Sequence, residues 1–204
     1  DVAGAKSLFP TNLMGPETTT FLNKTLHEGD VSNLQVIWSG DPSDFPFEQN
    51  QGVFQAAVTL SNGKFEFDES WPMVTELNVD LLFENEGLYM VSDHARILDV
   101  TVNDVTADIP YLGEGAILDI EVNGRTTGTL ATGLVQASSL QNSVGQALDF
   151  VQVSGPLDLE VQLTIPLTGL DIQVKGDVGF NNNPIYMPDL DIHLVQTQGR
   201  LSFH

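Results

Sequence analysis

The most constraining feature of this sequence is a run of alternating apolar and polar residues between positions 75 and 109. Leu77, Val79, Leu81 and Phe83 alternate with polar side chains, and the same pattern returns twice before the run ends. Because successive side chains on a strand point to opposite faces, this pattern predicts strands with one apolar and one polar face. The apolar face must be covered or occupied, so it is the first place to look for function.

The alternation also appears outside this run, and turn signals separate its segments. Residues 54–60, 118–122, 157–165 and 170–174 alternate in the same way. Asn62-Gly63 predicts a hairpin that returns through residues 65–67, since Asn-Gly between alternating runs favours a tight turn. Further turns are predicted at residues 93–94, 123–124 and 181–184.

Two regions have helical spacing instead. Pro16 and Gly29 bracket a segment in which Phe21, Leu22 and Leu26 fall on one side, which predicts a helix over residues 16–28 that packs on another element. Residues 126–151 predict a helical insert of one or two short helices, with Ser143 as a cap. The expected fold is a single mainly β domain over residues 1–204 with a few short helices (α+β). Its curved antiparallel, amphipathic sheet would form a groove or half-barrel.

Two distant segments have weakly similar sequences, and we call this similarity the internal echo. Residues 58–62 and 178–182 share the patterns Val-x-Leu-x-Asn and Val-x-Phe-x-Asn, and alternating strands follow both. The echo indicates either a repeated strand unit or the general likeness of alternating strands.

The charge of the chain excludes several classes of partner. Seven Lys and Arg residues face 28 Asp and Glu residues, for a formal net charge of −21. Nucleic-acid binding needs basic residues against phosphates, and docking on anionic head groups is disfavoured for the same reason. No cysteine is present, so disulfides and thiolate metal sites are excluded. We found no apolar run of membrane-spanning length and no signal peptide, and the first residues suggest a piece of a longer chain.

A search for catalytic and metal-binding motifs gives a negative result. The four histidines are widely separated, and the Ser61–Lys64 spacing falls on a predicted turn rather than a helix. The acidic pairs Asp41/Asp44 and Asp189/Asp191 lack the longer ladder of oxygen ligands that calcium needs, so we interpret them as solvated turns. The sequence therefore predicts no enzyme, no metal site and no cofactor.

The remaining feature is that the predicted strands have more apolar surface than the few predicted helices can cover. A sheet can hide such a face by packing on another sheet, by closing into a barrel, or by curling into a trough that holds an apolar guest. The residues predicted to line a groove of this kind are Leu77, Val79, Leu81, Leu118, Ile120, Leu159, Val161, Leu163, Ile172 and Val174. Each of them could equally be part of a packed core.

Several stretches in order resemble the YhdP branch of the bacterial AsmA-like family. They are residues 26–36, 40–47 with Phe-Pro-Phe, 52–54, 71–72 with Trp-Pro, 77–83, 87–91, 102–110 and 155–166. The resemblance implies a middle segment of a periplasmic β-rich trough whose parent chain is anchored in the inner membrane. It also implies a role in phospholipid movement between the inner and outer membranes, and it carries over no catalytic residue.

Two functions follow. The first is a conduit segment whose apolar face binds phospholipid or another apolar ligand. The alternative is a structural or protein-interaction β module of an envelope protein, with a self-covered core. The observation that separates them is whether the apolar face is capped by the chain's own helices or left open.

Overall fold

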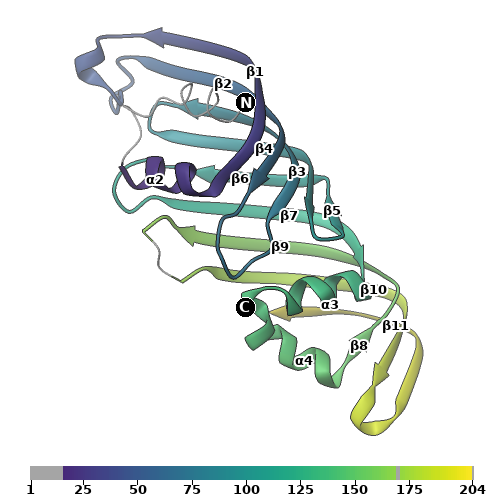
Figure 1. The fold of residues 1–204 in the computed structure, drawn as a ribbon. Helices are drawn as coiled ribbons and strands as arrows, with labels where there is room; N and C mark the ends of the chain where they lie inside the picture. The colour runs from purple at the N-terminus through teal and green to yellow at the C-terminus, as the bar shows by residue number, and fades with distance from the viewer. Residues whose placement is uncertain (1–15, 169–170, 204) are drawn as a thin grey trace.

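The computed structural model describes residues 16–168 and 171–203, and its main feature is one 11-stranded antiparallel sheet (Figure 1). The strands are β1 (Leu26–Ser39), β2 (Val53–Phe65), β3 (Val74–Glu84), β4 (Gly87–Ile97), β5 (Val100–Val102), β6 (Asp104–Ile109), β7 (Ile117–Thr127), β8 (Gln152–Val153), β9 (Pro156–Pro166), β10 (Gln173–Met187) and β11 (Ile192–Phe203). The predicted strand at Leu170 falls partly outside the described residues.

The strands follow one another through the sheet almost in chain order. The main path is β1-β2-β3-β4-β6-β7-β9-β10-β11, with β5 beside β4 and β8 beside β10. Among the described strands, β1 and β11 each pair on one side only, so the sheet does not close into a barrel. The predicted fold class, a mainly β chain with a curved antiparallel sheet and short helices, is confirmed.

Long, irregular strands replace most of the predicted turns. Asn62-Gly63 lies inside β2, where Asn62 has φ 54° and the register with β3 shifts. The predicted turns at residues 93–94, 123–124 and 181–184 likewise lie inside β4, β7 and β10, so these four turn predictions were wrong. A left-handed Asn suits the extra residue of a β-bulge as well as a tight turn, and only the partner strand decides between them.

The internal echo has a structural counterpart. Asn182 in β10 has φ 64°, close to the φ of Asn62, and the register with β11 shifts at the same place. Both segments are therefore long strands bent at a left-handed Asn. Bulges bend a strand and increase its twist, which contributes to the curvature of the sheet.

The helices are short. Helix α2 (Pro16–Thr25) ends before the predicted residue 28, because Leu26 already pairs with Phe65 in the sheet. Helices α3 (Gly128–Gln136) and α4 (Val144–Phe150) lie in the region predicted to be helical, with the 3-10 turn η2 (Ser139–Asn142) between them. Ser143 follows η2, and its hydroxyl donates to the carbonyl of Leu140 at 3.3 Å. Two more 3-10 turns are η1 (Pro42–Asp44) and η3 (Pro188–Leu190).

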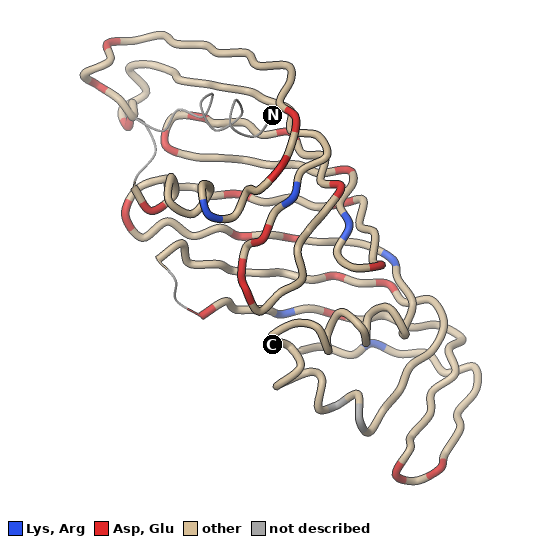
Figure 2. Tube along the Cα trace, viewed as in Figure 1, with Lys and Arg blue, Asp and Glu red and all other residues tan. Residues whose placement is uncertain are grey.

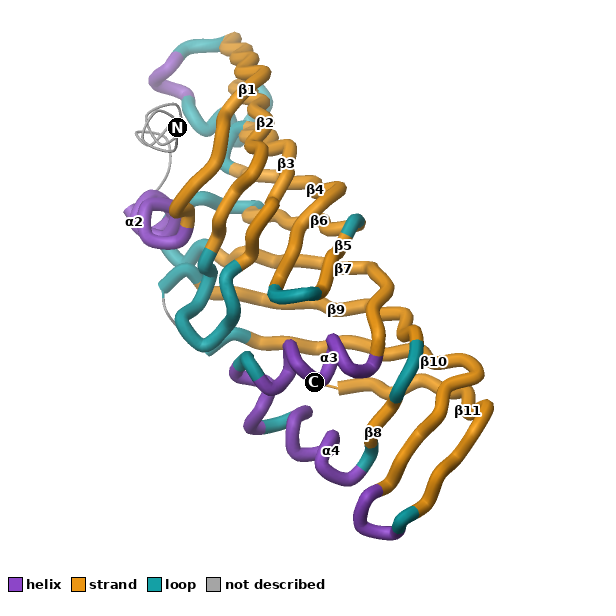
Figure 3. Tube along the Cα trace, turned by 45° about the vertical axis from the view of Figure 1, so that its right-hand side comes forward, coloured by secondary structure: helices purple, strands orange, loops and turns teal. Residues whose placement is uncertain are grey.

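All the described helices lie on one side of the sheet. Figure 3 shows α2, α3, α4 and the connection from β2 to β3 on this side. We call it the inner face, and it carries the buried side chains of Val58, Leu81 and Leu163. The opposite, polar face carries many of the carboxylates, which Figure 2 shows spread over the strands.

Cross-strand pairs hold the polar face together. Thr164 donates to Asp119 at 2.6 Å, Gln162 donates to Glu121 at 3.0 Å, and Arg125 pairs with Asp158 at 2.8 Å. Such exposed pairs contribute little individually. Partial burial, followed by the neighbouring charges of Asp119 and Glu121, raises the pKa of Asp108 above its ordinary value.

Candidate functional site

Rows of mostly apolar side chains, interrupted at Ser92 and Gly176, cross the inner face perpendicular to the strands. In the row named here the Leu81 row, each residue pairs with the next across neighbouring strands. Its members are Val58, Leu81, Met90, Ala107, Ile120, Leu163 and Val174. The Val79 row runs parallel to it through Leu60, Val79, Ser92, Val105, Val122, Val161, Gly176 and Phe203. Directly opposed residues of antiparallel strands share a face, so each row is a strip on one face.

A third strip, the Phe83 row, is the most deeply buried. Its members are Ala56, Phe83, Leu88, Ile109, Leu118 and Ile165, and all six are in the core. Phe83 and Ile109 are each 1% exposed and Leu88 is 0% exposed. The inner face is therefore packed over its middle strands, β2 to β9, as a protein core is, and we call these strands the centre of the sheet.

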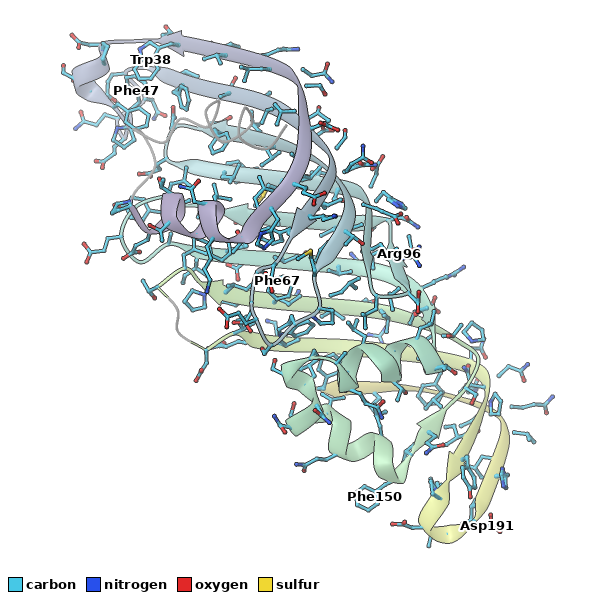
Figure 4. All side chains as sticks on the ribbon, in the orientation of Figure 1. Trp38, Phe47, Phe67, Arg96, Phe150 and Asp191 are labelled. Atoms are coloured by element: carbon cyan, nitrogen blue, oxygen red, sulfur yellow. The ribbon has the colours of Figure 1, made fainter. Side chains whose placement is uncertain are left out.

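Two segments cover this centre. Helix α2 contributes Phe21 and Leu22, and the connection from β2 to β3 contributes Phe67 and Trp71. We call residues 66–73 of this connection the strap. Phe67 lies in front of the sheet in Figure 4, and its ring centroid is 5.4 Å from that of Trp71 and 6.2 Å from that of Phe65. The strap and α2 together place apolar side chains on the rows.

Polar contacts attach α2 to a neighbouring loop and to the strap. The Thr18 hydroxyl donates to the carbonyl of Leu112 at 3.0 Å, and the Gly115 amide donates to the Glu17 carboxylate at 2.8 Å. These two bonds join α2 to the loop between β6 and β7. Lys24 pairs with Glu69 at 3.1 Å, which joins α2 to the strap.

The same face is uncovered at the two ends of the sheet. On β1, Val36 is opposite the buried Ala56, yet Val36 is 59% exposed. On β11, Leu201 is 42% exposed, and Leu194 is 39% exposed although it is opposite the buried Ile185. The apolar surface thus extends beyond its own cover in both directions.

An aromatic cluster borders the β1 end. Trp38 lies against Phe45, Phe47 and Phe54, with ring centroids 5.5 to 5.8 Å apart. Figure 4 shows Trp38 and Phe47 together at one corner of the sheet. The loop after β1 therefore closes one corner of the inner face, although Trp38 itself stays 39% exposed.

The structure brings the predicted groove residues together on the inner face. Val79, Leu81, Leu118 and Leu163 are buried in the core, and Leu77, Ile120, Val161, Ile172 and Val174 are partly buried against it. Leu159 is half-buried and pairs with Val178 on β10. Their shared face agrees with the alternation, while their role stays a prediction.

Sequence reasoning missed the residues that make the cover and the open ends. Phe67 was predicted as the end of a returning strand at residues 65–67, but it lies in the strap with Trp71, and neither residue was predicted to cover the sheet. Val36 and Leu201 belong to alternating segments, but exposure depends on which strands lie at the sheet ends. The predicted packing stripe of α2 did point to Phe21 and Leu22.

A hollow of about 410 Å³ crosses β7, β9, β10 and β11 and is lined by both polar and apolar residues. Its polar residues are Glu121, Asn123, Glu160, Gln162, Lys175, Asp177 and Ser202, and its other residues, Val122, Val161, Gly176 and Phe203, belong to the Val79 row. Val161 is the one predicted groove residue in this lining, so the hollow does not coincide with the predicted groove as a whole. In the described ranges, no cluster of three or more His, Asp or Glu residues could hold a metal ion. No described helix has both the length and the apolar character needed to cross a membrane.

Comparisons with known proteins agree with the earlier resemblance. The family model described as YhdP protein matches residues 1–204. The chain is 33% identical over 204 residues to a protein of Escherichia coli (strain K12) named intermembrane phospholipid transporter YhdP. The match covers 100% of this chain and 16% of that relative. A search of the solved structures gave no match. This chain belongs to the YhdP family.

Proposed function

We propose that this chain is a segment of a β-sheet conduit for phospholipid, in which acyl chains lie on the inner face. The relative from Escherichia coli is named a transporter of phospholipid between membranes. The present chain corresponds to a small part of that protein's length. Its contribution would be one stretch of the path in the periplasm, within a longer chain that is anchored in a membrane.

The observation that carries this proposal is the exposure of the inner face at both ends. Val36, Trp38, Leu194 and Leu201 continue an apolar face whose centre is buried. Exposed apolar surface of this kind marks a surface that binds something apolar. The Leu81 row runs from β2 to β10 and the Val79 row from β2 to β11, and neither row contains a charged residue.

The energetics suit an acyl chain. Each methylene removed from water is worth about 0.8 kcal/mol, so a lipid tail needs continuous apolar contact to cross an aqueous space. Rows of Val, Leu, Ile and Met side chains provide this contact without specific hydrogen bonds. A conduit of this kind needs no catalytic residue, and we propose no enzymatic activity.

The coverage of the centre favours the alternative, a structural β module. Phe83, Leu88 and Ile109 are nearly inaccessible, so this part of the face already serves as a core. The two functions differ at the ends of the sheet. A structural module would bind another protein surface there, whereas a conduit would bind lipid.

Photo-cross-linking separates them. The chain is incubated with vesicles of phosphatidylethanolamine and phosphatidylglycerol that contain a phospholipid with a diazirine in its acyl chain, and labelled peptides are identified by mass spectrometry. A conduit predicts labelling of inner-face residues of β1 and β11, such as Val36 and Leu201, in preference to polar-face neighbours. Uniform labelling, or none, would contradict the proposed function.

A further inference from the structure

We propose that α2 and the strap form a displaceable cover, which occupies the inner face in place of lipid and moves away when an acyl chain passes. This inference rests on the proposed function and adds a regulated step to it. The cover is built from residues 16–25 and 66–73, which flank β1 and β2 in the chain.

The strap lies where a continuous lipid path would run. Phe67 and Trp71 pack in the same cluster as Val79, Leu81 and Leu163, which belong to the two long rows. An acyl chain that follows these rows from one end to the other would need the surface that the strap rings occupy. The cover and a continuous lipid path are therefore mutually exclusive.

The contacts that attach the cover also favour displacement. The backbone amide of Glu66 donates to the carbonyl of Thr25 at 2.8 Å, and Ser70 and Trp71 bond to Asp68 within the strap. The Lys24–Glu69 ion pair is 71% and 83% exposed, so solvent screens it. Two further hydrogen bonds, from Thr18 to Leu112 and from Gly115 to Glu17, tie α2 to the loop between β6 and β7, whereas the contact of the cover with the rows is made by apolar side chains. A lipid tail can replace these apolar contacts without leaving strand hydrogen bonds unpaired.

The covered state also leaves two polar atoms unpaired. Among the described residues, Trp71 Nε1 and Thr19 Oγ1 are buried without a hydrogen-bond partner, and both belong to the cover. A buried donor without a partner costs free energy that is recovered when water reaches it. Opening the cover would release both groups, which lowers the cost of displacement.

The test uses the same diazirine phospholipid and compares labelling beneath the cover, in β7 and β9, with labelling at β11. Trp71→Ala removes the largest ring of the strap, and we expect about threefold or more labelling of β7 and β9, since a larger fraction of molecules is open. A purely structural Trp71 would lower stability without this increase.

A cross-linked variant tests the opposite direction. The chain has no cysteine, so Lys24→Cys with Glu69→Cys gives one thiol pair, and a short bifunctional thiol reagent then joins α2 to the strap. We expect the cross-linked form to lose labelling of β7 and β9 while β11 stays labelled. The same variant without the reagent is the matched control, and it should label like the unmodified chain.

The outcomes distinguish the two proposals. If β11 is labelled in every form of the protein, and β7 and β9 are labelled to the same extent in every form, the displaceable cover is overturned. The proposal of a conduit would then remain. Failure to label either region in every form, Trp71→Ala included, would overturn the conduit and the cover together.

Discussion

The centre and the ends of the inner face are built from the same alternating strands, yet they meet different surroundings. At the centre, every residue of the Phe83 row is 6% exposed or less. At the ends, Val36 and Leu201 lie on the same face and remain 59% and 42% exposed. An amphipathic strand therefore does not determine by itself whether its apolar face becomes core or binding surface.

A comparison of lengths explains the difference. The nine strands of the main path, at about 4.8 Å each, extend over roughly 38 Å. Helix α2 has 10 residues and is only about 15 Å long. Helices α3 and α4 lie on the same face, yet Val36 and Leu201 stay exposed, so α2, the strap and these two helices leave both ends of the sheet uncovered. Substitutions at the centre, at the ends and on the polar face test this difference.

Phe83→Ala addresses the centre. Because this ring is 1% exposed, its loss should lower the free energy of unfolding by about 3–5 kcal/mol, measured by chemical denaturation. Tyr89→Ala on the polar face of the neighbouring strand is the aromatic control, and it should cost about 1 kcal/mol or less. Similar losses for both would mean that the centre is not a core.

Val161→Asp addresses the transition from centre to end. A carboxylate at this half-buried position of the Val79 row should lower stability by roughly 2–3 kcal/mol and reduce lipid labelling. Glu160→Ala, one residue away on the polar face, should change stability by about 0.5 kcal/mol or less, because its contact with Arg200 is exposed. Equal damage from both substitutions would show that the faces are wrongly assigned.

Val36→Asp addresses the open end. This side chain is 59% exposed, so stability should change by about 1 kcal/mol or less, while lipid labelling of β1 should fall strongly. Gln35→Asp introduces the same charge on the other face of the same strand and should retain the labelling. Loss of folding with Val36→Asp would indicate that this end is covered in solution.

Asp108→Asn addresses the polar face behind the centre. Its pKa is raised above 3.8, so the ionised form is disfavoured in the folded state. The contribution of the Asp108 side chain to the free energy of unfolding is fully present below pH 3.8, the ordinary pKa of Asp. This contribution is lost as the pH rises through the pKa of Asp108 in the folded state. The Asn variant should therefore be more stable than the unmodified chain at pH 7, by about 1 kcal/mol or less, with no difference near pH 3.

Denaturation curves at both pH values measure this effect, with Asp104→Asn on the same strand as control. A destabilised Asp108→Asn variant at pH 7 would contradict the expected sign.

Much of the fold was predictable from the sequence because its signals are local. The alternation at Leu77, Val79 and Leu81 correctly predicted a strand and the apolar side chains that share one of its faces. The composition of residues 126–151 correctly predicted the helical region. The turn predictions failed at Asn62 because a bulge and a turn use the same left-handed backbone. The predicted groove residues share one face, but the sequence could not separate buried from exposed positions.

The sequence alone determined which side chains face the same way, since the two-residue period of a strand is a property of the backbone. It also determined the acidic, cysteine-free surface. Tertiary structure decided which parts of that apolar face are hidden. That outcome depends on where α2 and the strap fold back and on which strands end the sheet, and both are set by contacts between residues far apart in the chain, such as Thr18 with Leu112.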